Sequence, residues 1–339
     1  MMWLPLAAAT ALSGLLAQPV TAQAAEPPPP ATPGPDNAAI WTLQDENASI
    51  STAAMSDRYY TNGLRLGWIS PEGAAPGVLE DLGRTLWGHG QMRVGLDLSQ
   101  QIYTAADTTS GDPPLTDRPF AGVLLVTGSL VHDDAGARSV LALSLGVVGP
   151  SALGETVQNG FHDLIGQNKV EGWNTQLHDQ PVFQILSDRT WRLPVTSFEG
   201  VDVDALPSLA GSVGTLRVYG QAGVTMRLGQ GLDSDYGATR LRPGLTGTDV
   251  FRPTRPFAWY LFAGVDTQAV GYDITLNGNL WQDSRSVKVQ PLVSEFQGGL
   301  ALMFCGVRLT YTQVFQTQEF KYQKGGLHQF GSLALSVRF

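Results

Sequence analysis

Four polar side chains of one short segment have the types and the spacing of a hydrolytic site. Within residues 154–166 they recur at intervals that place them on one side of an α-helix: Glu155, Gln158, Asn159 and His162. A histidine can act as a general base because imidazole titrates close to neutral pH, and neighbouring amides can orient the base or donate to an oxyanion. The segment therefore has the inventory of a hydrolytic site, in which His162 is the candidate base and Gln158 and Asn159 are its candidate helpers.

The opposite side of this predicted helix is apolar and carries Val157, Phe161, Leu164 and Ile165. We expect this side to pack on the wall of a β-barrel, because the segment is the most helix-like stretch of a chain that otherwise alternates with a period of two. The polar side would then face whatever lies opposite.

Alternating strands are the elements that must hold the helix. Twelve runs show the alternation, at residues 40–46, 61–70, 91–103, 119–131, 138–148, 181–191, 196–211, 214–228, 257–270, 288–304, 306–320 and 328–339. No segment approaches the roughly 18 apolar residues of a spanning helix. An even number of strands, aromatic residues near their ends and a final Phe339 favour a twelve-stranded antiparallel transmembrane β-barrel, all-β apart from the short helix near residues 154–166. A soluble β-sandwich or a lipocalin-like barrel is the alternative.

Composition and termini narrow the class of protein further. The formal net charge of −9 argues against non-specific nucleic-acid binding, and the one cysteine excludes an internal disulfide framework. Residues 1–24 resemble a signal peptide that ends at an Ala-x-Ala cleavage pattern, and the proline-dense residues 25–38 read as an extended linker. Residues 39–339 are then a single barrel domain, exported through the periplasm to the outer membrane of a Gram-negative cell.

A second polar stretch ends the first predicted strand. Asp45, Glu46 and Asn47 follow one another there, where oxygen-bearing side chains would suit a lipid-facing wall poorly. Hard oxygen ligands are those that Ca²⁺ prefers, so Asp45 and Glu46 are candidate metal ligands. A solvated turn is the simpler interpretation of the same residues.

Several motifs in a fixed order resemble the lipid A deacylase (LpxR-type) outer-membrane family. In sequence they are Asp45-Glu-Asn47, Asp57-Arg-Tyr-Tyr-Thr-Asn-Gly-Leu64, Gln101-Ile-Tyr103, Asp117-Arg-Pro-Phe-Ala-Gly122, Gly149-Pro150, Val157-Gln-Asn-Gly-Phe-His-Asp-Leu-Ile-Gly166, Gly172-Trp173, Tyr311-Thr-Gln-Val-Phe315 and Phe330-Gly-Ser-Leu333. The resemblance covers nearly the whole mature chain. It implies a twelve-stranded barrel that removes the 3′-linked acyloxyacyl group of lipid A, requires Ca²⁺, and places its site between the barrel wall and a helix at the outer-leaflet side.

The family's functional residues match positions of this chain motif by motif. Its general-base histidine matches His162 and its threonine matches Thr61, while its Asn-Asp pair matches Asp45 and Glu46, or Gln44 and Asp45 after a shift of one residue. Two departures stand out. Asn168 takes the place of a carboxylate, for which Glu171 is the nearest acidic alternative, and residues 104–116 lack the family's basic residues for lipid phosphate.

The sequence leaves two other functions open. A porin or a structural outer-membrane protein would explain the strands equally well, with His162 and its neighbours filling the interior. An outer-membrane phospholipase could use the same chemistry on glycerophospholipids, since the choice of substrate depends on pocket shape and on basic residues that face phosphates. Candidates for such contacts are Arg58, Arg65, Arg118 and Lys169. We expect a membrane-embedded monomer that acts on lipid A or lipopolysaccharide in the outer leaflet.

Overall fold

The computed structural model describes residues 34–51, 58–241 and 249–339. Their strands are β1 (Ile40–Asn47), β2 (Tyr59–Ile69), β3 (Gln91–Thr104), β4 (Ala121–Asp133), β5 (Ala137–Val148), β6 (Gln180–Trp191), β7 (Leu193–Phe198), β8 (Val201–Gly214), β9 (Arg217–Gln230), β10 (Phe257–Asp273), β11 (Leu292–Phe304), β12 (Val307–Gln316) and β13 (His328–Arg338). The α-helices are α1 (Gly77–Trp87), α2 (Gly154–Ile165) and α3 (Ile274–Asn277), and short 3-10 helices are η1 (Ala48–Ile50), η2 (Pro150–Ala152), η3 (Trp173–Thr175) and η4 (Leu232–Ser234). The predicted signal peptide, 1–24, and most of the predicted linker lie outside the described residues.

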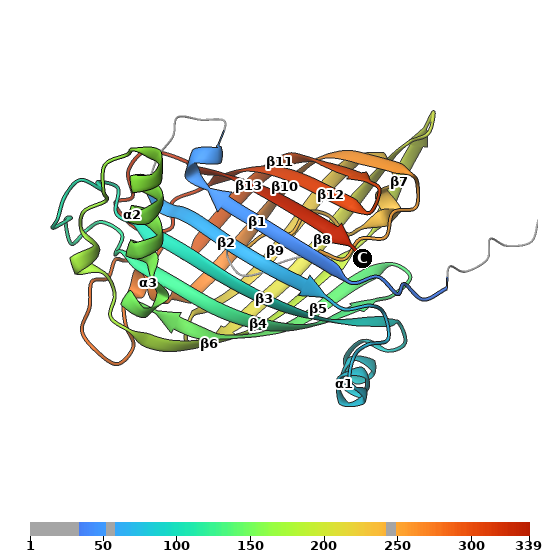
Figure 1. Ribbon diagram of the computed structural model, residues 1–339, viewed down its shortest axis with the longest axis horizontal. Helices are drawn as coiled ribbons and strands as arrows, with labels where there is room; N and C mark the ends of the chain where they lie inside the picture. Colours follow the sequence, from blue (N-terminus) through green and yellow to red (C-terminus); the bar gives the residue numbers. More distant parts are fainter. Residues whose placement is uncertain (1–33, 52–57, 242–248) are drawn as a thin grey trace, which may run out of the picture. The chain divides into compact units, whose positions relative to one another are not determined.

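The strands form one antiparallel sheet that closes into a barrel (Figure 1). Strands that follow one another in the sequence pair with each other, except β6 and β7, and β1 pairs with β13 to close the sheet. β7 continues the line of β6, since β8 pairs with β6 through 208–214 and with β7 through 201–205. The wall therefore has twelve strands, as the sequence predicts.

Side chains alternate between an apolar outer face and a polar lumen. In β1, Trp41 and Leu43 are exposed while Thr42 and Gln44 are buried, and in β3 the exposed Leu98 alternates with the buried Asp97 and Ser99. A soluble barrel has the opposite arrangement, because its apolar side chains must avoid water. Apolar outside and polar inside is the pattern of a barrel that lipid surrounds.

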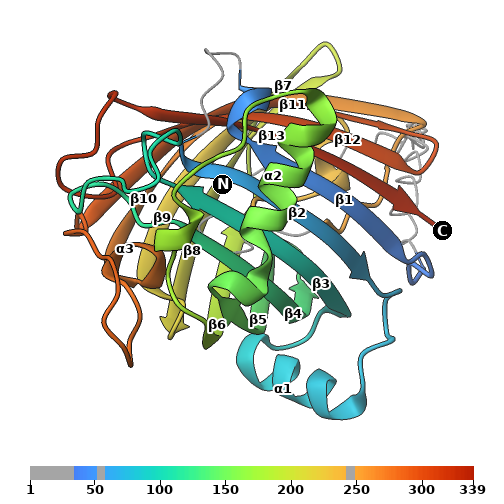
Figure 2. The same ribbon diagram turned by 60° about the vertical axis from the view of Figure 1, so that its left-hand side comes forward.

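Loop lengths orient the barrel. Two-residue turns at Glu199-Gly200 and Cys305-Gly306, with positive φ at both residues, and the short 134–136 turn lie at one end. Four long connections, 105–120, 149–179, 274–291 and 317–327, lie at the other, while the first end carries two, the one with α1 and the one between β9 and β10. Because such barrels have short periplasmic turns and long outer loops, α2 belongs to the outer end and α1 to the periplasmic end (Figures 1 and 2).

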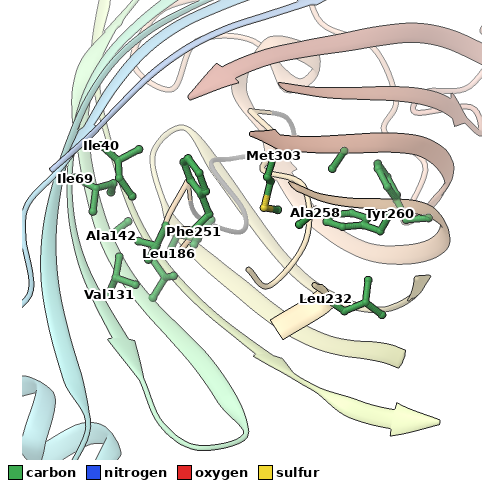
Figure 3. Packing of buried hydrophobic residues seen from close by; sticks show 14 of the residues in the cluster. Ile40, Ile69, Val131, Ala142, Leu186, Leu232, Phe251, Ala258, Tyr260 and Met303 are labelled. Carbon is green, nitrogen blue, oxygen red and sulfur yellow. The ribbon is translucent and has the colours of Figure 1, made fainter. Parts of the chain in front are cut away.

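The described residues of the connection between β9 and β10 lie in the lumen. Asp235 of this connection pairs with Arg227 at 2.6 Å and with Arg308 at 3.0 Å, and it accepts a hydrogen bond from Tyr260. Phe251 is fully buried and lies among inward-pointing residues from both sides of the barrel, Ile40 and Met303 among them (Figure 3). The lumen is thus packed with apolar contacts and ion pairs.

Two elements differ from the sequence prediction. α1 was not predicted from the sequence, because its pattern of apolar and charged residues is short and lies in a connection. Gly83 of this helix packs on Met92 of β3, while Val78 and Leu86 are exposed. The turn at Glu199-Gly200 divides the predicted strand 196–211 into β7 and β8. Both turn residues have a left-handed backbone, a conformation that glycine favours. Among the described residues, no helix has the length and hydropathy to cross a bilayer.

Candidate functional site

α2 lies outside the barrel, across the outer ends of β3 and β4 (Figures 1 and 2). It begins at Gly154, which touches Gly122 of β4: a Cβ on Gly154 would stand 2.7 Å from the Trp173 ring and 3.1 Å from the Gly122 Cα. It ends at Gly166, whose φ of 71° permits the left-handed cap, and the Gln167 N–H donates to the His162 carbonyl at 2.8 Å. Two glycines therefore set how closely and at what point the helix meets the wall.

The helix turns its polar side to the wall, which corrects the expected orientation. Gln158 and His162 are buried, whereas Phe161, Leu164 and Ile165 are 51, 81 and 48% exposed. We expected the apolar side to pack on the barrel, as it would in water. Lipid surrounds this wall, so apolar side chains gain by facing outward and the polar side is sheltered between helix and barrel.

His162 is held in one tautomer. Its Nδ1 lies 2.6 Å from the main-chain carbonyl of Asn168, and because a carbonyl only accepts, Nδ1 carries the proton and Nε2 the lone pair. Asn168 contributes through its backbone, so the amide that replaces the family's carboxylate does not disturb this contact. An imidazole oriented in this way can accept a proton through Nε2.

The two amides of the helix have different tasks. Gln158 Oε1 accepts from the Trp173 indole at 3.1 Å, which fixes the direction of this amide inside the covered layer. Asn159 uses both ends of its amide on the backbone of Val170, accepting at 2.8 Å and donating at 3.3 Å. Asn159 thus holds the segment after the helix in place, and its role in this structure is positional.

The wall beneath the helix supplies hydroxyls and amides. Thr61 lies at a bulge of β2, and its hydroxyl shares a 2.9 Å hydrogen bond with the Thr104 hydroxyl of β3. Thr104 shares its face with Ile102, which packs against Trp173 of the covering segment, so this pair is on the outer face. Both threonines are buried.

Asp45 also belongs to this outer face. It shares the face of the exposed Leu43, and its Oδ1 accepts from Asn62 Nδ2 at 2.8 Å. In the register of the sheet, Asp45 pairs with Leu64 of β2, and Leu64 pairs with Gln100 of β3. Gln100 in turn donates to the carbonyl of Ala152, two residues before α2 begins. Asp45 and the helix therefore lie at the same end and on the same side of the wall.

Glu46 points the other way, into the lumen. It is fully buried and accepts from the Tyr60 hydroxyl at 2.9 Å, from the Leu241 N–H at 2.9 Å and from Gln44 at 3.2 Å. Adjacent residues of a strand point to opposite faces, so the predicted pair Asp45 and Glu46 cannot share one cation. Instead, Glu46 ties β1 to the segment that fills the lumen.

Few oxygen ligands for a calcium ion remain on the outer face. Among the described residues, no group of three or more His, Cys, Asp or Glu side chains could hold a metal. Asn62 Oδ1, however, is buried without a hydrogen-bond partner in the described chain, while Nδ2 of the same amide donates to Asp45. A carboxylate and an amide carbonyl suit Ca²⁺, which completes its shell with water and ligand oxygens, so Asp45 and Asn62 fit the ion and Glu46 does not.

Two of the four basic residues proposed for lipid phosphate are buried in ion pairs. Arg65 pairs with Asp97 and Asp249, and Arg118 pairs with Glu319 at 2.5 Å; both are nearly inaccessible. Arg65 joins the wall to the segment in the lumen, whereas Arg118 joins the outer connections 105–120 and 317–327. Arg58 is half-buried, and Lys169 is exposed and lies 3.5 Å from Asp163.

Sequence reasoning missed Asn62, Thr104 and Trp173 as parts of the site. Asn62 and Trp173 stand in quoted motifs, but their faces could not be assigned, because the bulge at Thr61 shifts the alternation of β2. Thr104 carries no signal of its own in the sequence.

The glycine contact offers a first prediction. We expect Gly154→Val to lose at least about 90% of the catalytic rate while the barrel keeps its stability, because the added side chain would meet Trp173 and Gly122 and lift α2 from the wall. Gly160→Val, where a Cβ meets nothing within 4 Å, is the matched control. Full activity of the Gly154 variant, measured beside its heat-modifiable migration on gels, would contradict the assigned docking.

Comparison with known proteins places this architecture in a family. The family model described as "Outer membrane protein LpxR" matches residues 6–339. The structure is similar to that of LpxR from Salmonella typhimurium, with 20% sequence identity, a TM-score of 0.74, and coverage of 88% of this chain and 100% of that one. The β domain of the Bordetella autotransporter BrkA is a more distant likeness, at 13% identity, a TM-score of 0.40 and coverage of 91% and 99%. No curated protein matches the sequence. With a matching family model over nearly its whole length, the chain belongs to the LpxR family of outer-membrane proteins.

Proposed function

We propose that this protein is an outer-membrane esterase that removes the 3′-linked acyl (acyloxyacyl) group of lipid A by attack of a water molecule that His162 activates. The observation that carries the proposal is the buried His162, oriented by the Asn168 carbonyl, between a lipid-facing helix and a polar patch of the outer wall. Membership of the LpxR family supports lipid A as the substrate class.

The chain's own residues account for the steps of ester hydrolysis. Nε2 of His162 takes a proton from water while the oxygen of that water attacks the ester carbonyl. The Gln158 amide, oriented by Trp173, donates to the oxyanion that forms. The imidazolium then returns its proton to the departing sugar oxygen, which yields a free fatty acid and a 3′-hydroxyl group. No serine nucleophile is required.

The exposed apolar side of α2 supports a lipid substrate. Phe161, Leu164 and Ile165 face the surrounding lipid on the same helix whose other side carries His162. Acyl chains can therefore remain in an apolar environment while an ester group reaches the sheltered polar layer. A water-soluble ester would gain nothing from this arrangement.

Calcium would assist the same reaction. When bound, the ion would polarise the ester carbonyl, a contribution of several kcal/mol in comparable sites. Asp45 and Asn62 are the residues that would hold it.

The two faces of β1 make this metal assignment testable. We expect Asp45→Asn to raise the Ca²⁺ concentration for half-maximal activity by about tenfold or more, because the only outer-face carboxylate of β1 loses its charge. Glu46→Gln, one residue away but facing the lumen, should leave the calcium requirement unchanged and lower stability. The measurement is a calcium titration of fatty-acid release; equal shifts in both variants would contradict the assignment.

The substrate experiment offers purified protein hexa-acylated lipid A and phosphatidylethanolamine in separate mixed micelles and identifies the released acyl chains. Loss of one acyloxyacyl group from lipid A alone supports the proposal. Release of fatty acid from the glycerophospholipid at an equal rate would favour a phospholipase. If neither lipid were hydrolysed, the proposal that the protein is an enzyme would be contradicted.

A further inference from the structure

Lysine is unevenly distributed in this barrel. The chain has four lysines, Lys169, Lys288, Lys321 and Lys324. All four lie in connections at the outer end: Lys169 between α2 and β6, Lys288 between β10 and β11, and the other two between β12 and β13. The arginines, in contrast, occur at both ends and in the lumen.

Three of these lysines and one arginine gather on neighbouring loops. The Lys321 N–H donates to the Lys288 carbonyl at 2.8 Å, beside an isolated bridge between Val289 and Phe320. Lys324 is joined to β2, because its N–H donates to the Tyr59 hydroxyl at 2.9 Å and its carbonyl accepts from that hydroxyl at 3.1 Å.

Arg58 completes the group. Its guanidinium lies against Gly325, where a Cβ would come within 2.4 Å of Nη2, and 5.5 Å from the centre of the Tyr59 ring. We call Arg58, Lys288, Lys321 and Lys324 the basic surface.

The charges of the basic surface have no anionic partner within the described part of the chain. No described carboxylate lies within 4.0 Å of any of the four, whereas Lys169 pairs with Asp163. Arg58 Nε is buried and makes no hydrogen bond to a described residue. The bridge also sets Lys288 opposite Lys321, an arrangement of like charges that destabilises a strand pair unless an anion lies between them.

The level of the basic surface along the barrel indicates the kind of anion. Tyr322, 65% exposed, has the Lys321 ammonium 4.9 Å from its ring centre, and Leu327 on the same loop is 45% exposed. An exposed aromatic ring beside a lysine is typical of the interface between hydrocarbon and headgroups. The lipids at the outer end of an outer-membrane barrel are lipopolysaccharides, whose headgroups carry phosphate.

We propose that the basic surface binds the phosphorylated saccharide headgroup of lipopolysaccharide. Its lysines lie on the connections between β10 and β11 and between β12 and β13, whereas His162 lies on α2 across β3 and β4, so the two groups have no residue in common. The binding does not depend on hydrolysis.

The test measures binding without turnover. The full-length protein in zwitterionic detergent is titrated by calorimetry with the bisphosphorylated glucosamine disaccharide of lipid A, freed of its acyl chains. We expect the triple variant Lys288→Gln, Lys321→Gln, Lys324→Gln to bind about 10- to 100-fold more weakly, with a smaller dependence on salt. Arg58 is kept because it packs on Tyr59 and Gly325.

Three controls decide the outcome. Lys169→Gln, at the outer end but paired with Asp163, and Arg84→Gln, on α1 at the other end, should bind as the wild type does. The same disaccharide without phosphates should bind the wild type and the triple variant equally weakly. His162→Ala should retain binding, which separates this proposal from the proposed hydrolysis. Unchanged affinity of the triple variant, or binding of inorganic phosphate as tight as that of the disaccharide, would overturn the assignment.

Discussion

His162→Ala is expected to lower the rate of fatty-acid release from lipid A by about 10²- to 10⁴-fold, the contribution of a positioned general base. The side chain lies between helix and wall, and its Nδ1 contact to Asn168 leaves Nε2 as the atom that accepts the proton of water. Without the imidazole, water must attack the ester unassisted. The binding of lipid A should change little, so the loss belongs to kcat rather than to KM.

A second histidine provides the control. His178 is exposed in the same connection between β5 and β6, and His178→Ala should keep the wild-type rate. Both variants should migrate as folded barrels on unheated gels, because neither side chain contributes to the wall. If His162→Ala retained a rate within a few-fold of the wild type, another group would have to be the base.

Arg227→Met is expected to destabilise the barrel by about 3–5 kcal/mol, because it leaves buried carboxylates without their strongest partner. Arg227 binds Asp204 at 2.5 Å, Asp235 at 2.6 Å and the Leu232 carbonyl at 2.8 Å. Methionine fills similar volume and carries no charge. The free energy of unfolding in urea, measured in lipid vesicles, gives the loss directly.

The same variant tests whether the lumen conducts ions. The wild type should show no stepwise conductance in a planar bilayer, because the segment held by Arg227 and Arg308 fills the lumen. Arg227→Met should loosen that segment and open transient current. Arg84→Met on α1, half-exposed and paired only with Glu80 and Asp81, should change stability by less than about 0.5 kcal/mol and leave the barrel closed. Large, stable channels in the wild type would favour a porin.

The sequence predicted the wall better than the site. Alternation marked nearly every strand, since an apolar outer face and a polar lumen impose a period of two, and the helix 154–166 was found within one residue. The orientation of that helix was wrong, because a helical pattern says which sides differ but not which solvent surrounds them. Asp45 and Glu46 were expected to bind one ion because they are adjacent in the sequence. Adjacent residues of a strand point to opposite faces, so the alternation of β1 already excluded this pairing.

The lumen was the part least accessible from sequence. Arg65 and Arg118 looked like surface cations, yet their partners Asp249 and Glu319 are far away in the chain. Only the closed sheet brings them together. The bulge at Thr61 had a similar effect, because one extra residue decides which neighbours of Thr61 face the helix.

The most direct measurement is mass spectrometry of lipid A from a Gram-negative host that makes hexa-acylated lipid A and expresses this protein. The account predicts a new species that has lost the acyloxyacyl group at the 3′ position, present with the wild type and absent with His162→Ala at equal barrel abundance. Lipid A that keeps all its acyl chains in the presence of abundant, folded wild-type protein and added Ca²⁺ would contradict it.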